Sequence, residues 1–353
     1  MPSPLLLIDQ QAFRENALRL NQVLAAQGKF CHFDCSSFAS QTPLLEMLAR
    51  KGLTRFASSR VVDFNYLGPY AQDRLLLRSP MLSEVAAVVD LCDLSCNTEW
   101  QVICALSDAA LVRQKVHRVL VQVDLGDLTS GLQLEAAEQL IAKLVNLRGV
   151  RLAGLKTTFN GYGGILPDLA KLEELTKFAK FIEQRFGIGL EYVSGLNSSA
   201  LSLLDEKKLP PDLRHFVIGE TLLTGREAAY GGSFAGLNQN IFSLQAEVVE
   251  AQRRPSLPQG QSGHRNRDTA IHYEDRGLIQ RVNLAFGRQE LAGHNLEPKL
   301  RGIRYLGQTQ DQTFYDVTGL NKRLGPGDHL EFMLNYPGLL QALVSAYISK
   351  VLV

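Results

Sequence analysis

Residues 192–231 read YVSGLNSSALSLLDEKKLPPDLRHFVIGETLLTGREAAYG. The pattern through Val193 indicates a strand, and residues 197–199 (Asn-Ser-Ser) then open an apolar helical pattern. A second strand, His215–Ile218, ends in the same way at Gly219. Hydroxyls and main-chain N–H groups at two neighbouring strand ends can face one ligand, which predicts an anion site. The alternative is that Asn-Ser-Ser only caps the helix.

The same alternation of strand and helix extends from this stretch back toward the N-terminus. We expect strands at residues 30–33, 55–57, 74–77, 94–95, 118–123, 151–155, 190–193 and 215–218, with helical patterns between them. About eight strands, each followed by a helix, predict an α/β fold: a closed (β/α)8 TIM barrel over residues 9–240, with its chemistry at the carboxyl ends of the strands. An open doubly wound sheet is the alternative, but no GxGxxG motif follows the first strand.

After Asn240 the pattern changes to strands separated by Gly, Pro and Asn turns. We expect strands at residues 241–251, 277–286, 302–306, 313–317 and 329–333. Residues 241–353 therefore form a C-terminal all-β domain in this interpretation, joined by an N-terminal strand over residues 1–8. Residues 253–275 are polar and lack a period, which predicts a long loop.

Composition narrows the class of function. The chain has 353 residues, is 45% hydrophobic and carries a formal net charge of +1, so it can bury a large core and shows no bias toward nucleic acid or an anionic membrane. The N-terminal MPSPLLLIDQQAF resembles neither a signal peptide nor a membrane span, so we expect a cytoplasmic protein. The five cysteines include no CxxC pair, which favours buried thiols over disulfides or a metal site. A small-molecule enzyme, or a relative of one, fits best.

Several passages, in this order along the chain, carry a resemblance to a known family: VDLGDL, NGYGGILP, SGLNSSAL, IGETLLTGREAAYGG, EDRG, FGRQEL and LNYPGLLQAL. Together they resemble the fold-type III pyridoxal-phosphate enzymes, and among these the ornithine-racemase-like members of the alanine racemase family. The resemblance implies a phosphate cradle matched in this chain by Asn197, Ser198, Ser199, Gly219 and Glu220, with Tyr336 reaching the phosphate from the C-terminal domain.

Three positions depart from what the resemblance implies. The family's lysine, which binds the cofactor as a Schiff base and serves as a base, follows the first barrel strand, where this chain has Ser36, or Asp34 if the register slips by two. Val217 stands where an arginine faces the pyridine nitrogen, and Thr129 and Ser130 stand where relatives commonly carry an arginine and an acid. Loss of all three predicts a site that no longer performs ordinary racemisation.

Other residues leave an active enzyme open. Lys156 ends a predicted barrel strand on the same side as Thr158, so it could replace the missing lysine; the alternative is a solvated or phosphate-pairing lysine at the rim. His264 and Tyr273 lie on the long loop where racemases present a second base to the partner subunit, although they could be plain loop residues.

Two hypotheses follow from these residues. The first is a non-racemising protein that binds a small phosphorylated ligand, such as noncovalently held pyridoxal phosphate. The second is a pyridoxal-phosphate-dependent amino-acid racemase that uses Lys156. In both, the resemblance implies a homodimer.

Overall fold

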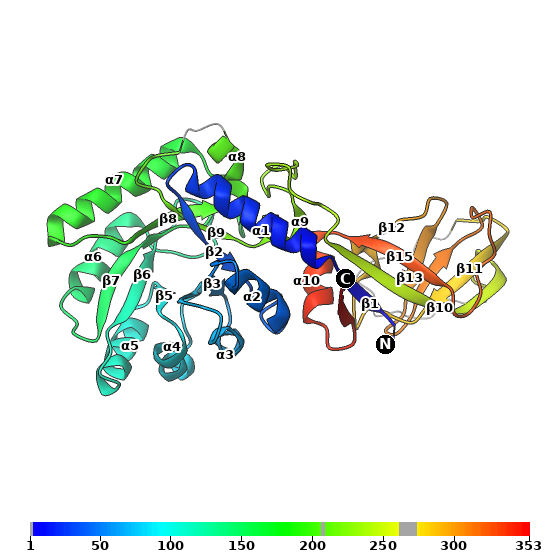
Figure 1. Ribbon diagram of the computed structural model, residues 1–353, viewed down its shortest axis with the longest axis horizontal. Helices are drawn as coiled ribbons and strands as arrows, with labels where there is room; N and C mark the ends of the chain where they lie inside the picture. The colour runs from blue at the N-terminus through cyan, green and yellow to red at the C-terminus, as the bar shows by residue number, and fades with distance from the viewer. Residues whose placement is uncertain (1–2, 206–208, 261–273) are drawn as a thin grey trace. The chain divides into compact units, whose positions relative to one another are not determined.

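The computed structural model describes residues 3–205, 209–260 and 274–353 (Figure 1). The chain divides into two compact units. One is Gln11–Gln239, and the other combines Met1–Gln10 with Asn240–Val353.

The first unit is a closed barrel of eight parallel strands (Figure 1). The strands are β2 (Phe30–Asp34), β3 (Arg55–Ser58), β4 (Asp73–Leu76), β5 (Leu94–Asn97), β6 (His117–Gln122), β7 (Val150–Lys156), β8 (Tyr192–Asn197) and β9 (His215–Ile218). Each strand pairs with the next, and β2 pairs with β9 to close the barrel, with Phe30 opposite His215. The predicted (β/α)8 barrel is confirmed.

Helices follow the strands along the chain and cover the outside of the barrel (Figure 1). They are α1 (Gln10–Ala25), α2 (Thr42–Ala49), η1 (Val61–Asp63), α3 (Phe64–Leu67), η2 (Leu82–Glu84), α4 (Val85–Leu91), α5 (Trp100–Val112), α6 (Leu134–Leu144), α7 (Leu169–Phe186), η3 (Ser198–Ala200), α8 (Leu201–Asp205) and α9 (Glu220–Thr224). Helix α7 shows why these segments start and stop where they do. Asp168 caps it by accepting a hydrogen bond from the Lys171 N–H at 2.9 Å, and Gly187 ends it in the left-handed conformation.

Two register shifts shape the barrel interior. One lies between β6 and β7, and the other lies between β8 and β9. After the first shift Lys156 is paired with Gln122 on one side and Ser194 on the other. Gly154 is required beside this point, because a Cβ there would collide with the carbonyl oxygen of Tyr192. The first shift therefore sets which side chains of β6 and β7 lie side by side, and the second does the same for β8 and β9.

The second unit is built on a sheet in the order β12-β15-β10-β11-β14-β13, with β1 lying between β10 and β16. Its elements are β1 (Leu5–Ile8), β10 (Phe242–Pro255), β11 (Leu278–Leu284), η4 (Gly293–Asn295), β12 (Leu296–Pro298), β13 (Arg304–Gln308), β14 (Thr313–Asp316), β15 (His329–Leu334), α10 (Tyr336–Val344) and β16 (Ser349–Leu352). Buried and more exposed positions alternate along the first half of β10, as expected when one face of a sheet covers a core.

The structure differs from the sequence-based expectation at two places in this unit. Strand β10 runs to Pro255, so residues 253–255 are strand and not loop, because they pair with Leu278–Gln280 of β11. The unit also contains the helix α10. Its N-cap is Asn335, whose side chain accepts a hydrogen bond from the Gly338 N–H at 2.9 Å, and a proline occupies the first turn. These start signals were present in the sequence.

Candidate functional site

The strand ends of β8 and β9 lie side by side at one end of the barrel, with Asn197 opposite Val217. Asn197 caps η3: its side-chain oxygen accepts hydrogen bonds from the Ser199 N–H at 3.0 Å and the Ser199 hydroxyl at 2.5 Å. Its amide nitrogen donates to the Phe159 carbonyl at 2.7 Å. Asn197 therefore caps the helix, which was the alternative interpretation of the sequence. Its side-chain oxygen and amide nitrogen both bond groups of the protein itself.

Ser198 joins the two strand ends. Its hydroxyl accepts a hydrogen bond from the Thr221 N–H of α9 at 3.3 Å. The Thr221 hydroxyl is buried and has no hydrogen-bond partner among the described residues. A buried hydroxyl without a partner is unfavourable, so this corner retains a donor that a bound anion would satisfy. The phosphate end of the family's cofactor fits these residues.

Gly219 and Glu220 come directly after β9. A Cβ on Gly219 would lie 3.1 Å from the Cβ of Asp34, so glycine allows the ends of β9 and β2 to approach. Burial, followed by the charge of Glu227, raises the pKa of the Glu220 carboxyl. Both causes disfavour the charged form of Glu220.

The end of β2 carries a network of hydroxyl and carboxyl groups. The Asp34 carboxyl accepts hydrogen bonds from the Ser36 N–H at 3.0 Å and from the Ser36 hydroxyl at 2.5 Å. The Ser58 hydroxyl donates to Asp63 at 2.5 Å and lies 3.3 Å from the Ser36 hydroxyl. Burial raises the pKa of both carboxyls, against the lowering effect of the serine hydrogen bonds. Short polar side chains that bond one another therefore occupy this strand end.

Lys156 lies at the end of β7 and is buried, with 7% of its surface exposed. Its ammonium group donates a hydrogen bond to the Thr158 hydroxyl at 2.8 Å, so the two side chains share one side of the strand, as alternation predicted. The interpretation of Lys156 as a solvated lysine at the rim is wrong, because β7 directs it into the barrel. Its charge acts on Asp34 and His215, which places it between the two strand ends and the barrel interior.

Beneath Lys156 runs a chain of buried polar side chains that the sequence analysis missed. The Ser194 hydroxyl lies 2.9 Å from His215 Nδ1, His215 Nε2 lies 2.8 Å from His32 Nδ1, and His32 Nε2 lies 3.3 Å from the Asp73 carboxylate. One arrangement of protons satisfies the first two contacts, in which the serine donates to His215 and His215 donates to His32. The His32 Nε2 faces Asp73 but makes no hydrogen bond of good geometry with the described residues. Burial lowers the pKa of both histidines, so they are held neutral. The sequence signal that could have revealed this chain is a histidine within an otherwise apolar barrel strand.

Asp73 anchors the other end of this chain. It accepts hydrogen bonds from Arg118 at 2.6 Å and from the Tyr192 hydroxyl at 2.7 Å. Arg118 also pairs with Glu191 at 3.1 Å. Polar groups thus continue from the amino end of the barrel to Ser194, which is paired with Lys156.

Val217, Thr129 and Ser130, which were predicted to depart from the family's pattern, contact other parts of the protein. Val217 packs against the apolar cluster inside the barrel. Ser130 accepts a hydrogen bond from Gln122 at 2.6 Å, and Thr129 accepts one from the Tyr162 N–H at 2.7 Å.

Three further predicted site residues lie in the second unit or outside the described residues. Tyr336 is the first residue of α10 in the second unit. His264 and Tyr273 lie outside the described residues.

No helix in the described ranges is long and apolar enough to cross a membrane.

Comparison with known proteins agrees with this architecture. The model of the alanine racemase N-terminal domain matches residues 8–212. The chain belongs to the alanine racemase family. This is a family of fold-type III, pyridoxal-phosphate-dependent amino-acid racemases.

Two relatives are similar to this chain along almost its whole length. An ornithine racemase of Acetoanaerobium sticklandii is 32% identical over 348 residues, which cover 98% of this chain and 99% of the relative. A lysine racemase of Thermotoga maritima is 29% identical over 357 residues, which cover 99% of each chain. The resemblance to ornithine-racemase-like members is confirmed.

Solved structures show the same fold. An alanine racemase of Clostridium difficile 630 superposes with a TM-score of 0.76 at 14% identity, covering 100% of this chain and 96% of the other. A D-threonine aldolase from Filomicrobium marinum superposes with a TM-score of 0.75 at 14% identity, covering 100% and 91%.

Proposed function

We propose that this member of the family binds a small phosphate-bearing ligand of the pyridoxal phosphate class without a covalent link at β2, and does not perform ordinary alanine or ornithine racemisation. The end of β2 carries the proposal. Asp34 and Ser36, one of which stands where the family's lysine is expected, bond each other and contact the Ser58 hydroxyl. Neither side chain is an amine, so neither can bind an aldehyde as lysine does.

The cradle residues would hold the phosphate. The Ser198 hydroxyl, the main chain at Gly219 and the unpartnered Thr221 hydroxyl would supply donors at one corner of the barrel end, whereas the Ser199 hydroxyl already donates to Asn197. Asn197 would act indirectly, since its own hydrogen bonds set the conformation of Ser199. Pyridoxal phosphate, when bound, supplies an electron sink for reactions at the α-carbon of amino acids.

Val217, Thr129 and Ser130 do not offer the polar contacts that we expect racemisation to use. Val217 offers no donor or acceptor from its side chain, so it cannot modulate the pyridine nitrogen. Thr129 and Ser130 offer hydroxyls in place of a guanidinium. Thr129 is engaged with the N–H of Tyr162, and Ser130 is engaged with the Gln122 side chain of β6. Binding the phosphate alone would not restore the lost rate, because uniform binding does not lower the barrier.

One observation favours a second candidate, an active amino-acid racemase that uses Lys156. Lys156 is a buried amine at the carboxyl end of a barrel strand, which is the end where barrel enzymes hold their reacting groups. The Ser194–His215–His32–Asp73 chain beneath it could accept or return a proton.

Borohydride trapping separates the two candidates. The purified protein is mixed with pyridoxal phosphate, treated with borohydride, digested and analysed by peptide mass spectrometry. We expect loss of the yellow colour on dialysis and no reduced adduct on Lys156. The variants Lys156→Ala and Lys177→Ala provide a matched pair, because Lys177 is an exposed surface lysine.

Racemisation is measured in parallel with L-alanine and L-ornithine by chiral chromatography. Turnover above the no-enzyme control that disappears in Lys156→Ala, but not in Lys177→Ala, would replace the first candidate by the second. Absence of any binding when pyridoxal phosphate is titrated into the protein at equilibrium would contradict both.

We also propose a cytoplasmic homodimer, on the basis of the family resemblance. His264 and Tyr273, predicted to act on a partner's barrel, would require such an assembly. Sedimentation equilibrium at micromolar concentration checks this proposal, and a monomer would contradict it.

A further inference from the structure

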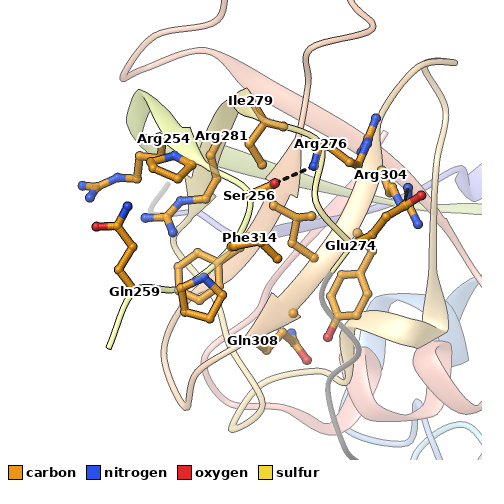
Figure 2. A pocket seen from close by; sticks show the side chains of 16 residues that line it. Arg254, Ser256, Gln259, Glu274, Arg276, Ile279, Arg281, Arg304, Gln308 and Phe314 are labelled. Atoms are coloured by element: carbon orange, nitrogen blue, oxygen red, sulfur yellow. Dashed lines mark hydrogen bonds and ion pairs between the residues drawn. The ribbon is translucent and has the colours of Figure 1, made fainter. Parts of the chain in front are cut away.

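The second unit contains a cavity of about 520 Å³ on one face of its sheet (Figure 2). Arg254 of β10, Arg281 of β11, Arg304 of β13 and Phe314 of β14 line it, together with Arg276. These strands are neighbours in the order β10-β11-β14-β13, so alternate side chains gather on one side. We call this cavity the arginine pocket.

The arginine pocket has more cations than nearby anions. Arg276 pairs with the buried Asp316 at 2.5 Å, and Arg304 pairs with Glu274 at 2.9 Å. The positive charges of those two guanidinium groups are therefore balanced by carboxylates, so the excess positive charge lies elsewhere in the pocket.

Arg254 and Arg281 share a single carboxylate. Arg254 is 2.9 Å from Glu250, whereas Arg281 is 3.7 Å from the same oxygen. The Nε of Arg281 is buried and has no hydrogen-bond partner among the described residues. Burial, followed by the charge of Arg254, lowers the pKa of Arg281, which shows that this guanidinium is incompletely compensated. An added anion between the two arginines would relieve both effects.

The rest of the lining is apolar. The Arg281 guanidinium lies over the Phe314 ring, 5.1 Å from its centroid, and Ile279 and Leu306 extend the wall. Figure 2 shows Arg254 and Arg281 directed to the same side of the pocket, next to Gln259. A volume of about 520 Å³ is in the range that small organic ligands occupy.

We propose that the arginine pocket binds a small organic anion with an aromatic body. Arg254 and Arg281 hold its carboxylate or phosphate, and Phe314 packs against the ring. Guanidinium groups match both anions through paired N–H donors, which is why carboxylate and phosphate are one class here. This site goes beyond the proposed function, because every lining residue belongs to the second unit.

The test measures binding by saturation-transfer NMR and isothermal titration on the full chain. The probes are benzoate and phenyl phosphate, compared with inorganic phosphate, which lacks the ring, and benzyl alcohol, which lacks the charge. We expect binding of benzoate or phenyl phosphate and at least tenfold weaker binding of the other two, on the order expected for loss of one charge-assisted contact. Inorganic phosphate that binds as tightly as phenyl phosphate would overturn the aromatic part of the proposal.

Variants locate the site. Arg281→Met should weaken binding about tenfold or more, and Arg281→Lys should weaken it less, since lysine keeps the charge but not the planar fork. Arg253→Met is the matched control, because Arg253 is an exposed neighbour on β10 outside the lining. Circular dichroism checks folding, and if Arg281→Met does not fold, the partly exposed Arg254→Met replaces it. Equal weakening in Arg253→Met, unchanged binding in Arg281→Met or Arg254→Met, or no binding of either aromatic anion would overturn the proposal.

Discussion

Replacing Asp73 by asparagine should destabilise the barrel by about 3 kcal/mol at pH 7, the low end of the range for breaking a buried ion pair. Asp73 holds Arg118 at 2.6 Å, and its side chain is only 15% exposed. The low end applies because Arg118 keeps Glu191, at 3.1 Å, as a second partner. Tyr192→Phe removes one hydrogen bond to the same carboxylate and should cost about 1 kcal/mol.

The effect of Asp73→Asn should depend on pH in a defined direction. Burial by itself raises the pKa of Asp73, but the neighbouring His32, Tyr192 and Arg118 outweigh it and hold the pKa below its usual range. A carboxyl with a lowered folded-state pKa stabilises the protein above its unfolded value of about 3.9, and this contribution is lost as the pH falls through the folded value. The difference between wild type and variant should therefore be full from pH 7 to 5 and shrink only below about pH 4.

Urea denaturation followed by circular dichroism at pH 7, 5 and 4 measures this. Asp90→Asn is the control, because Asp90 and Arg113 form a similar pair at the surface, where little change in stability is expected. A loss for Asp73→Asn no larger than for Asp90→Asn would refute the argument from burial. A difference that shrinks between pH 7 and 5 would show that a histidine, and not Asp73, controls the effect.

Three further outcomes are expected. Burial lowers the pKa of His117 to about 4. The contribution of His117 to the free energy of unfolding is therefore complete above the unfolded-state pKa of about 6.5 and should be lost as the pH drops toward 4. A His117→Gln variant should show a flatter dependence of stability on pH in urea denaturation. Burial raises the pKa of the Cys31 thiol to about 12, so a maleimide at pH 8 should label the more exposed Cys104 in the folded protein and Cys31 only in urea, as peptide mapping can show. Gly154→Ala should lower the free energy of unfolding by more than about 2 kcal/mol, because the added Cβ meets the backbone of β8. Gly189→Ala, where nothing lies within 4 Å of the added Cβ, should change it by no more than about 0.5 kcal/mol in the same denaturation assay.

Much of the fold could be predicted from local patterns. The alternation of strand and helix up to His215–Ile218 predicted the barrel, because the hydrophobic period of a segment depends only on neighbours along the chain. Even the side of β7 on which Lys156 lies followed from strand alternation. The helix α10 was missed although Asn335 and the following proline marked its start.

What only the tertiary structure decided was which side chains from distant strands meet. His32 and His215 are 183 positions apart, and they touch because closing the barrel pairs β2 with β9. Lys156 lies beside Ser194 because the long-range pairing of β7 with β8 sets that alignment. The shared carboxylate of Arg254 and Arg281 likewise arises from the pairing of β10 with β11. The sequence by itself determined the elements and their order. The buried polar chain and the arginine pocket were decided by the pairing register across the sheets, which local periodicity does not specify.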